Sequence, residues 1–316
     1  MQIVVTDGYT LNPGDLSWDE ISALGDLRVY ERTSADEFEE RCKTANIILT
    51  NKVPITRDRI SKLPQLQLIS VLATGYNVID IAAAKEKGIL VCNVPAYGTA
   101  SVAQHVLALL LELTNRVSLH AQSTANGEWQ RAQDWGYTKA PITELSGKTF
   151  GIVGFGHIGQ QVARIAYAFG MKVIYYNPSS KKSSLGEAVE LNEVFQQSDV
   201  VSLHCPLKED NVQFVNKHLL SQMKRTALLI NTARGQLINE QDLADALNNN
   251  IIGGAGLDVL SKEPPTEGNP LINAKNCVVT PHNAWMSKEA RKRMMDVTTE
   301  NVKAFLKRQP VNVVNR

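Results

Sequence analysis

The sequence predicts an α/β fold built from two doubly wound, Rossmann-like domains with parallel sheets. Short apolar, β-branched segments alternate with longer helical segments along the chain, which is the pattern of parallel strands joined by helical connections. The strand segments fall into two series. A chain of 316 residues is also long enough to form two domains of ordinary size.

The predicted strands are mostly apolar without strict alternation, as expected for strands that helices cover on both faces. The first series comprises Ile3–Thr6, Ile47–Thr50, Leu68–Val71 and Leu90–Cys92. The second series comprises Thr149–Val153, Lys172–Tyr176, Val200–Leu203, Ala227–Asn231, Gly254–Leu257 and Cys277–Thr280.

Two helical segments bear on how the domains are divided. Ser101–Leu111 lies between the two strand series, and Thr99 or Ser101 is a plausible N-cap for it. The segment Ser287–Arg308 reads as an amphipathic helix. Because the second strand series is complete before this helix, the helix could return to the first domain, which would then be discontinuous.

The composition excludes several classes of protein. The chain has 33 basic and 32 acidic side chains and a net charge of +1, so we expect no nucleic-acid partner. The longest apolar run of the first long helix, Val106–Leu111, is far short of the roughly 20 residues that cross a membrane, so we expect no membrane partner. The N-terminal residues lack the pattern of a signal peptide.

The four cysteines indicate a reducing compartment. Cys42, Cys92, Cys205 and Cys277 lie far apart and form no C-x-x-C pair, so neither a disulfide framework nor a metal site is expected. The cytoplasm is the simplest location for such a chain.

A glycine-rich turn, Gly154–Gly159, has the G-x-G-x-x-G spacing of a dinucleotide site. The spacing alone is a weak signal, but here a strand precedes it and the helical segment Gln160–Phe169 follows it. Gly154 permits a tight turn, Gly156 lets the backbone approach a pyrophosphate, and Gly159 allows close packing of helix and strand. The helix N-terminus offers N–H groups to the phosphates. A glycine turn without a ligand is the alternative.

The end of the next strand bears on the choice between NAD and NADP. An acidic residue at this position would bind the ribose hydroxyls and repel a 2′-phosphate. The chain has Asn177 here, followed after Pro178 by Ser179, Lys181 and Lys182. Ser179 or Lys181 could contact a phosphate, or the two lysines could belong to a solvated loop. Both cofactors therefore remain open.

Four polar residues follow strands of the second series. Arg234, Asp258 and His282 each come shortly after a strand, and Glu263 lies a few residues after Asp258. Because parallel strands end at the same edge of a sheet, these side chains can meet there.

This set of residues suits the reduction of a ketone by hydride transfer. Negative charge develops on the oxygen and a proton must arrive, for which His282 is a natural donor near neutral pH. Glu263 against its other ring nitrogen would fix the tautomer and stabilise the imidazolium. Arg234 could bind a carboxylate and the keto oxygen. Taken singly, each has a commoner structural interpretation; together with the dinucleotide turn, they favour catalysis.

The other histidines are weaker candidates. His105 lies on the Ser101 helix and is expected to be structural, while His120 and His218 are expected on the surface. His157 occupies the glycine turn, where its backbone matters more than its ring. His204 ends a strand beside the expected cofactor groove.

Together these motifs resemble the D-isomer-specific 2-hydroxyacid dehydrogenase family, over nearly the whole chain. The residues that carry the resemblance are Gly154–Gly159, His204–Leu207, Asn231–Gly235, Gly256–Val259, Glu263–Pro265 and Thr280–His282. The resemblance implies that Arg234 binds the substrate and polarises its carbonyl, that His282 is the general acid, and that Glu263 is its partner.

The resemblance also implies the residues that contact ligands. The implied cofactor contacts are Val102, Gly154, Gly156, His157, Ile158, Gly159, Asn177, His204, Pro206, Thr232, Ala233, Arg234, Asp258 and His282. The implied substrate contacts are Lys52, Gly75, Tyr76, Arg234 and His282.

Family resemblance further implies a division of the chain and an assembly. Residues 1–98 plus 287–316 would form the substrate domain and residues 99–286 the dinucleotide-binding domain. A homodimer would use the helix from Ser101 and the region Trp129–Tyr137. Two positions depart from the family pattern: Asn177 replaces the usual acid, and Asn283 stands where an apolar residue is more usual.

Within the family, the chain is most similar to members that reduce hydroxypyruvate to D-glycerate. The similarity lies in Thr50–Val53, Ala73–Asn77, Ser101–His105 and Trp285. Glyoxylate, pyruvate or a bulkier 2-keto acid remain alternatives because the sequence does not show pocket size. An alternative of another class is a non-catalytic, cofactor-sensing corepressor. The retention of Arg234, Glu263 and His282 favours an enzyme.

Overall fold

The computed structural model describes residues 1–179 and 183–316, and these form two compact units. The first unit comprises Met1–Gly98 and Met286–Arg316, and the second comprises Thr99–Trp285. We expected the second domain to end at residue 286, whereas the second unit ends at Trp285. Met286 belongs to the first unit, where its carbonyl oxygen accepts a hydrogen bond from Arg291 Nε at 3.0 Å.

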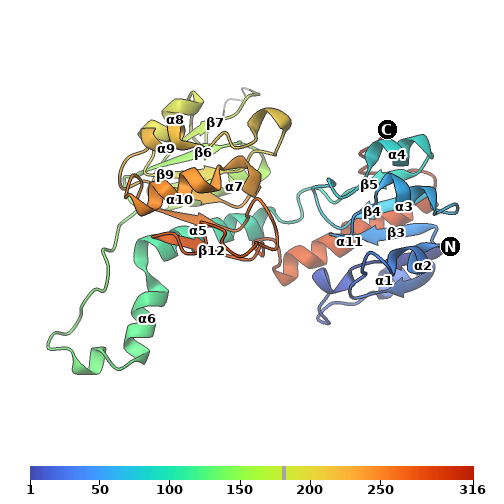
Figure 1. Ribbon diagram of the computed structural model, residues 1–316, viewed down its shortest axis with the longest axis horizontal. Coiled ribbons are helices and arrows are strands. Elements are labelled where there is room, and N and C mark those ends of the chain that lie inside the picture. The colour runs from blue at the N-terminus through green and yellow to red at the C-terminus, as the bar shows by residue number, and fades with distance from the viewer. Residues whose placement is uncertain (180–182) are drawn as a thin grey trace. The chain divides into compact units, whose positions relative to one another are not determined.

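The first unit contains a five-stranded parallel sheet in the order β2-β1-β3-β4-β5 (Figure 1). The strands are β1 Gln2–Val5, β2 Asp26–Val29, β3 Ile47–Thr50, β4 Leu68–Val71 and β5 Leu90–Cys92. The short helices are α1 Asp19–Ser22, α2 Phe38–Cys42, α3 Arg57–Ser61 and α4 Ile81–Glu86. Strand β2 was not predicted from the sequence. It is a mostly exposed edge strand and lacks the apolar run that marks the buried strands.

The last helix, α11 (Lys288–Leu306), returns the chain to the first unit and contacts β4. Ser287 caps it by accepting a hydrogen bond from the Ala290 N–H at 3.2 Å. The residues after the helix then run along β5. There, Val314 donates to the Val91 carbonyl at 2.8 Å, and the Asn315 side chain accepts from the Val91 N–H at 2.9 Å. The first unit is therefore made of two distant stretches of sequence.

The second unit contains a seven-stranded parallel sheet in the order β12-β11-β10-β9-β6-β7-β8. The strands are β6 Thr149–Val153, β7 Lys172–Tyr176, β8 Glu187–Ala188, β9 Val200–Leu203, β10 Leu228–Asn231, β11 Gly254–Leu257 and β12 Cys277–Val279. Strand β8 was also missed by the sequence analysis, because two exposed residues give no strand signal.

Helices cover both faces of this sheet. One apolar cluster joins the sheet to α5 and α7, and the other joins it to α8, α9 and α10. The helices of the unit are α5 Thr99–Asn115, α6 Val117–Ala125, α7 His157–Ala168, α8 Leu191–Gln197, α9 Lys217–Gln222 and α10 Glu240–Asn248. The predicted α/β class with two doubly wound parallel sheets is confirmed.

The start of α5 corrects one expectation. Thr99 and Ser101 lie inside the helix rather than capping it, because the helix already begins at Thr99. The Ser101 hydroxyl instead donates to the Ala284 carbonyl at 2.6 Å. Since Ala284 lies two residues after His282, this bond ties the helix to the loop that follows β12.

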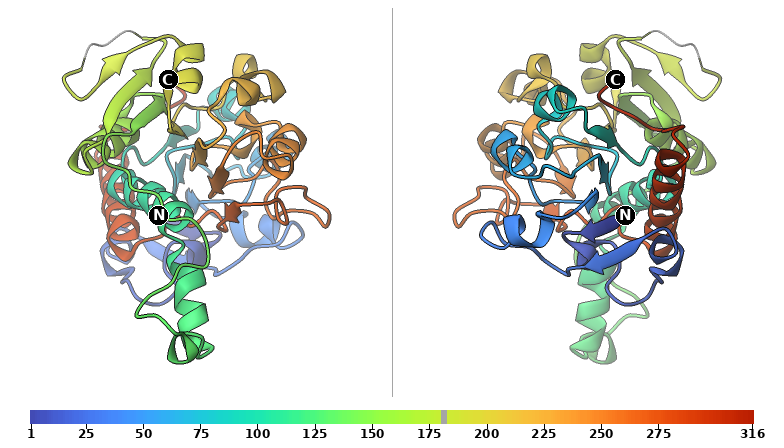
Figure 2. Two further views of the ribbon diagram at one scale, coloured as in Figure 1. Left: turned by 90° about the vertical axis from the view of Figure 1, so that its left-hand side faces the viewer. Right: turned by 90° about the vertical axis from the view of Figure 1, so that its right-hand side faces the viewer.

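Helix α6 and the segment after it extend away from the body of the second unit (Figures 1 and 2). The returning segment is tied to the helix by a 2.6 Å hydrogen bond between Ser123 Oγ and the Tyr137 hydroxyl. Large apolar side chains on this arm face solvent, with Trp135 98% exposed and Val117 61% exposed. In the part of the chain that the structure describes, no helix is both long and apolar enough to cross a membrane.

Candidate active site

The glycine turn lies at the point where the second sheet reverses its strand order. Strand β6 has β7 on one side and β9 on the other, and ligands of such sheets bind beyond the carboxyl ends of the strands at this point. Gly154 follows β6 with a φ of +95°, and a Cβ atom on it would overlap the backbone of Cys205 after β9. A Cβ atom on Gly159 would overlap the Gly154 carbonyl oxygen. Both positions therefore require glycine.

The residues around this turn fit a dinucleotide. A Cβ atom on Gly156 would have no neighbouring atom within 4 Å, so this side of the turn is open to a ligand. Helix α7 begins directly afterwards at His157 and presents its N-terminus there. The Thr232 hydroxyl, after β10, is buried without a hydrogen-bond partner among the described residues, as expected of a group that awaits a ligand.

Asn177 joins the glycine turn to the loop after β7. Its side-chain oxygen accepts a hydrogen bond from the Phe155 N–H at 3.2 Å, and its Nδ2 donates to the Ser179 carbonyl at 2.7 Å. Its amide thus carries no negative charge into the position where an acid would meet the ribose. Lys181, one of the two residues considered for a phosphate contact, lies outside the described residues, as does Lys182.

Glu263 and His282 form a direct pair. His282 Nδ1 lies 2.6 Å from Glu263 Oε2, while Glu263 Oε1 accepts a hydrogen bond from the Leu260 N–H at 3.0 Å. One oxygen of the Glu263 carboxylate is held by the Leu260 N–H, and the other orients the imidazole of His282. Because Nδ1 is bound to Glu263, Nε2 is the ring nitrogen that can exchange a proton with a substrate. Neither side chain is fully buried: 34% of Glu263 and 26% of His282 is exposed.

Asp258 holds the loop that carries His282. Its carboxylate is 1% exposed and accepts three hydrogen bonds, from the Thr280 hydroxyl at 2.6 Å, the Asn283 N–H at 3.0 Å and the Ala284 N–H at 2.9 Å. Asn283, whose role the sequence left open, contributes its backbone to this cluster. These three donors are all protein groups, and the expected contact of Asp258 with a cofactor stays a prediction.

His105 completes the cluster from helix α5. Its Nε2 lies 2.9 Å from the Thr280 hydroxyl oxygen and 3.4 Å from Asp258. The single hydroxyl proton of Thr280 is directed to Asp258, which accepts only. His105 Nε2 must therefore carry a proton and donate it to Thr280, which assigns the tautomer of this histidine.

The loop that carries Arg234 packs directly against the Glu263 loop. Gly235 approaches Leu260 so closely that a Cβ atom on Gly235 would overlap the Leu260 carbonyl group. The Arg234 side chain is half-buried, and its Nη1 donates to the Ala233 carbonyl at 2.6 Å. Since the Leu260 N–H binds Glu263, the residue next to Arg234 lies against the residue that holds the Glu263 carboxylate.

Glu240, at the start of α10, is a supporting residue that the sequence analysis missed. Its carboxylate accepts hydrogen bonds from the Ser261 N–H at 2.7 Å and from Asn269 Nδ2 at 3.0 Å, on either side of Glu263 in the chain. Gln236 adds a 2.8 Å hydrogen bond to the Ser261 carbonyl. An acid in the first turn of a helix is common, so no sequence signal distinguishes Glu240.

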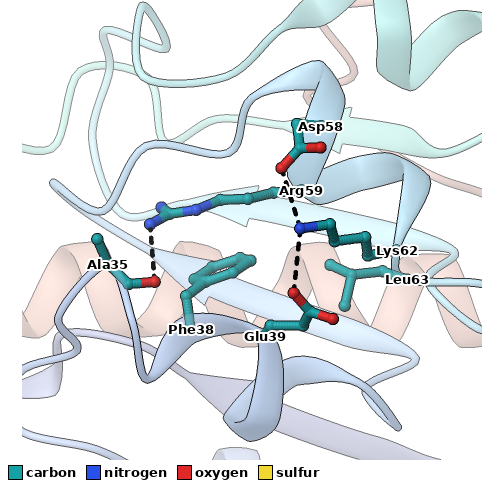
Figure 3. Close-up of a pocket in the computed structure, with 7 residues that line it drawn as sticks. All are labelled: Ala35, Phe38, Glu39, Asp58, Arg59, Lys62 and Leu63. Carbon is teal, nitrogen blue, oxygen red and sulfur yellow. Dashed lines mark hydrogen bonds and ion pairs between the residues drawn. The ribbon is translucent and has the colours of Figure 1, made fainter.

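The substrate residues expected in the first unit follow neighbouring strands of its sheet. Lys52 comes after β3 and is exposed, while Gly75 and Tyr76 come after β4, with Tyr76 38% exposed. They share the carboxyl edge of that sheet. A separate cavity of about 90 Å³ lies between α2 and α3 (Figure 3), but there Lys62 lies 3.2 Å from both Glu39 and Asp58. We assign it no ligand because its charges already pair with one another.

Comparisons with known proteins identify the family of this chain. Residues 107–284 match the model of the D-isomer specific 2-hydroxyacid dehydrogenase, NAD binding domain. The chain belongs to this family, and it is an oxidoreductase of that family's kind, as the sequence motifs predicted.

Individual relatives match over most of their length. A hydroxypyruvate reductase of Blautia hydrogenotrophica is 50% identical, with 100% of each chain covered. A glycerate dehydrogenase of Methylorubrum extorquens is 41% identical, with 92% of each chain covered. Among solved structures, an acyclic imino acid reductase in complex with NADPH and D-Arg has a TM-score of 0.88 and 36% identity, covering 99% of this chain and 100% of that one.

Replacing Gly235 with alanine tests the contact between the Arg234 loop and the Glu263 loop. The new methyl group would have to displace the Leu260 backbone, so Gly235→Ala should lower the free energy of unfolding of the second unit by about 1–3 kcal/mol. The measurement is denaturant unfolding. Gly136→Ala is the matched control, since its Cβ would meet no atom within 4 Å. Equal stability of both variants would contradict the contact.

His204, at the end of β9, should make stability depend on pH. Burial lowers the pKa of His204 to about 3, and its Nε2 lies 2.9 Å from the Ser202 hydroxyl. Between the folded and the unfolded pKa, His204 therefore binds a proton in the unfolded chain but not in the folded chain. Stability is retained above the unfolded pKa of about 6.5 and falls as the pH drops below it towards 3. In unfolding measured from pH 7 to pH 4, His204→Gln should reduce this slope by up to one proton. An unchanged slope would contradict the effect.

Proposed function

We propose that this protein reduces hydroxypyruvate to D-glycerate with a nicotinamide cofactor. The observation that supports the proposal is the Glu263–His282 pair in a chain of this dehydrogenase family, together with the close contact between the Glu263 loop and the Arg234 loop. The hydroxypyruvate reductase that is 50% identical over the full length supports the choice of substrate.

Each catalytic residue has a separate role in the reduction. A bound nicotinamide cofactor supplies the hydride. His282 holds a proton on Nε2 for the keto oxygen as negative charge develops there, and Glu263 keeps the ring oriented and stabilises the imidazolium. The Arg234 guanidinium binds the substrate carboxylate and polarises the carbonyl. Asp258 contributes by binding the Thr280 hydroxyl before His282 and the Asn283 and Ala284 N–H groups after it.

The remaining substrate contacts are proposed for the first unit. Lys52 supplies a positive charge, and the backbone N–H groups around Gly75 and Tyr76 bind the substrate carboxylate. Both suit a small anionic keto acid because neither requires a large apolar side chain on the substrate. Arg234 and His282 complete the proposed set of substrate residues.

We propose that the cofactor is NAD or NADP, bound at the glycine turn. Asn177 brings no charge that would repel a 2′-phosphate, and a structural relative with 36% identity holds NADPH. The cofactor contacts proposed from the family are Val102, Gly154, Gly156, His157, Ile158, Gly159, Asn177, His204, Pro206, Thr232, Ala233, Arg234, Asp258 and His282.

We also propose a cytoplasmic homodimer. All four cysteines of the chain are free thiols, which fits a reducing compartment. The α6 arm exposes Trp129 by 53% and Trp135 by 98%, and exposed apolar groups of this size are typical of surfaces that a second chain covers.

The proposal is tested by assaying the purified protein for reduction of hydroxypyruvate, glyoxylate and pyruvate, each with NADH and NADPH. We expect the highest kcat/KM with hydroxypyruvate. A preference for glyoxylate would change the proposed substrate but not the proposed type of reaction. Absence of turnover with every keto acid, while a dinucleotide still binds, would instead favour a cofactor-sensing protein.

Removing the proton donor should abolish most of the activity. His282→Ala should lower kcat by roughly two to four orders of magnitude, because general acid catalysis by a positioned side chain contributes about that much. Binding of NADH or NADPH, followed by fluorescence, should survive. The exposed His218→Ala is the matched control and should keep full activity. Unaltered turnover in His282→Ala would show that His282 is not the proton donor.

A further inference from the structure

Asp7, in the first unit, is a buried carboxylate that the proposed chemistry does not use. It lies two residues after β1 and is 5% exposed. Its oxygens accept hydrogen bonds from the Asn51 N–H at 2.9 Å, the Lys52 N–H at 2.6 Å and the Thr6 hydroxyl at 2.9 Å. Hydrogen bonds to an ionised acceptor are roughly twice as strong as neutral ones. The carboxylate therefore fixes the backbone at the point where the chain leaves β3.

The arrangement repeats that of Asp258 in the second unit. Each aspartate follows a strand, β1 or β11, and is almost fully buried. Each accepts two successive backbone N–H groups from the loop after the neighbouring strand, β3 or β12, and a threonine hydroxyl. In the second unit, the loop held in this way carries the catalytic His282. In the first unit, the loop held in this way carries Lys52.

A chain of hydrogen bonds extends from this loop along the edge of the first sheet. The Asn51 side chain, itself 4% exposed, donates from Nδ2 to the Leu72 carbonyl, just before the loop that carries Gly75 and Tyr76. Within that loop, the Thr74 hydroxyl donates to the Val94 carbonyl at 2.8 Å. The ends of β1, β3, β4 and β5 are thus linked by polar groups, beginning at Asp7.

We propose that Asp7 is a positioning residue for substrate binding. It fixes the Lys52 backbone directly and, through Asn51, the Leu72 carbonyl that precedes the Gly75–Tyr76 loop, so that a small carboxylate meets a backbone already held in place. This inference rests on the proposed function. Because a preorganised anion site loses less entropy on binding, loss of the carboxylate should weaken substrate binding more than it slows the chemical step.

The experiment compares steady-state kinetics of the full chain and of Asp7→Asn with hydroxypyruvate. Asparagine keeps the shape, but it offers one accepting oxygen and turns an NH₂ group towards the donors of the loop. Because the loosened loop must then be ordered when the substrate binds, KM should rise by about tenfold. We expect kcat to change less than threefold, and the Kd for NADH, bound by the second unit, to stay unchanged. Asp26→Asn, whose side chain is 68% exposed, is the matched control and should behave as wild type.

A second variant keeps the test decisive if Asp7→Asn does not fold. Thr6→Val preserves the side-chain shape and removes only the hydroxyl that donates to Asp7, so it should raise KM by a few-fold.

In a double-mutant cycle, the effect of Asp7→Asn on KM should shrink when Lys52 is alanine. A purely structural role would give no such coupling.

The outcomes separate this inference from the proposed function. An unchanged KM in folded Asp7→Asn, or an equal loss of NADH affinity, would overturn the positioning role while leaving the enzyme's activity intact. Absence of keto-acid reduction by the wild-type protein would overturn the proposed function, and this inference with it.

Discussion

The hydrogen bond between a buried carboxylate and a backbone N–H group is the interaction on which the functional edge of each sheet depends. A parallel strand that ends leaves its following loop without a ladder partner, and an unpaired N–H group is costly to bury. Asp258 satisfies two such groups beside His282, and its carboxylate needs no cation because the loop itself supplies the donors. If that carboxylate were absent, the Thr280 hydroxyl and the Asn283 and Ala284 N–H groups around His282 would lose their shared acceptor.

Close backbone contact is the second constraint, and glycine makes it possible. Gly154 lies against Cys205, and Gly235 lies against Leu260, each at a distance that a side chain would not allow. The first contact joins the turn after β6 to the loop after β9 at the cofactor position. The second joins the Arg234 loop to the Glu263 loop. The spacing of functional groups is therefore set by the main chain, which is stiffer than a set of side-chain contacts.

Much of this could be predicted from the sequence because apolar runs and glycines act locally. The buried strands β3 to β7 and the glycine turn follow from such patterns, and strand order places Arg234, Glu263 and His282 at one edge. The exposed edge strands β2 and β8 give no apolar signal. The partners of Asp258 could not be predicted either, since Thr280, Asn283 and Ala284 meet it only once β11 and β12 are paired. A sequence gives the types of residue, whereas these hydrogen bonds depend on how β11 and β12 pair in space.

The strand-like tail of the first unit has a consequence for synthesis. Met286–Arg316 belong to the unit that begins at Met1, and Val314 and Asn315 hydrogen-bond to β5. As the chain leaves the ribosome, the second unit can close as soon as residue 285 has emerged. The unit that contains Met1–Gly98 stays incomplete until Met286–Arg316 have also been made. Until then, its sheet edge at β5 and the face that α11 covers lack these partners, so the incomplete unit exposes apolar surface while the second unit folds.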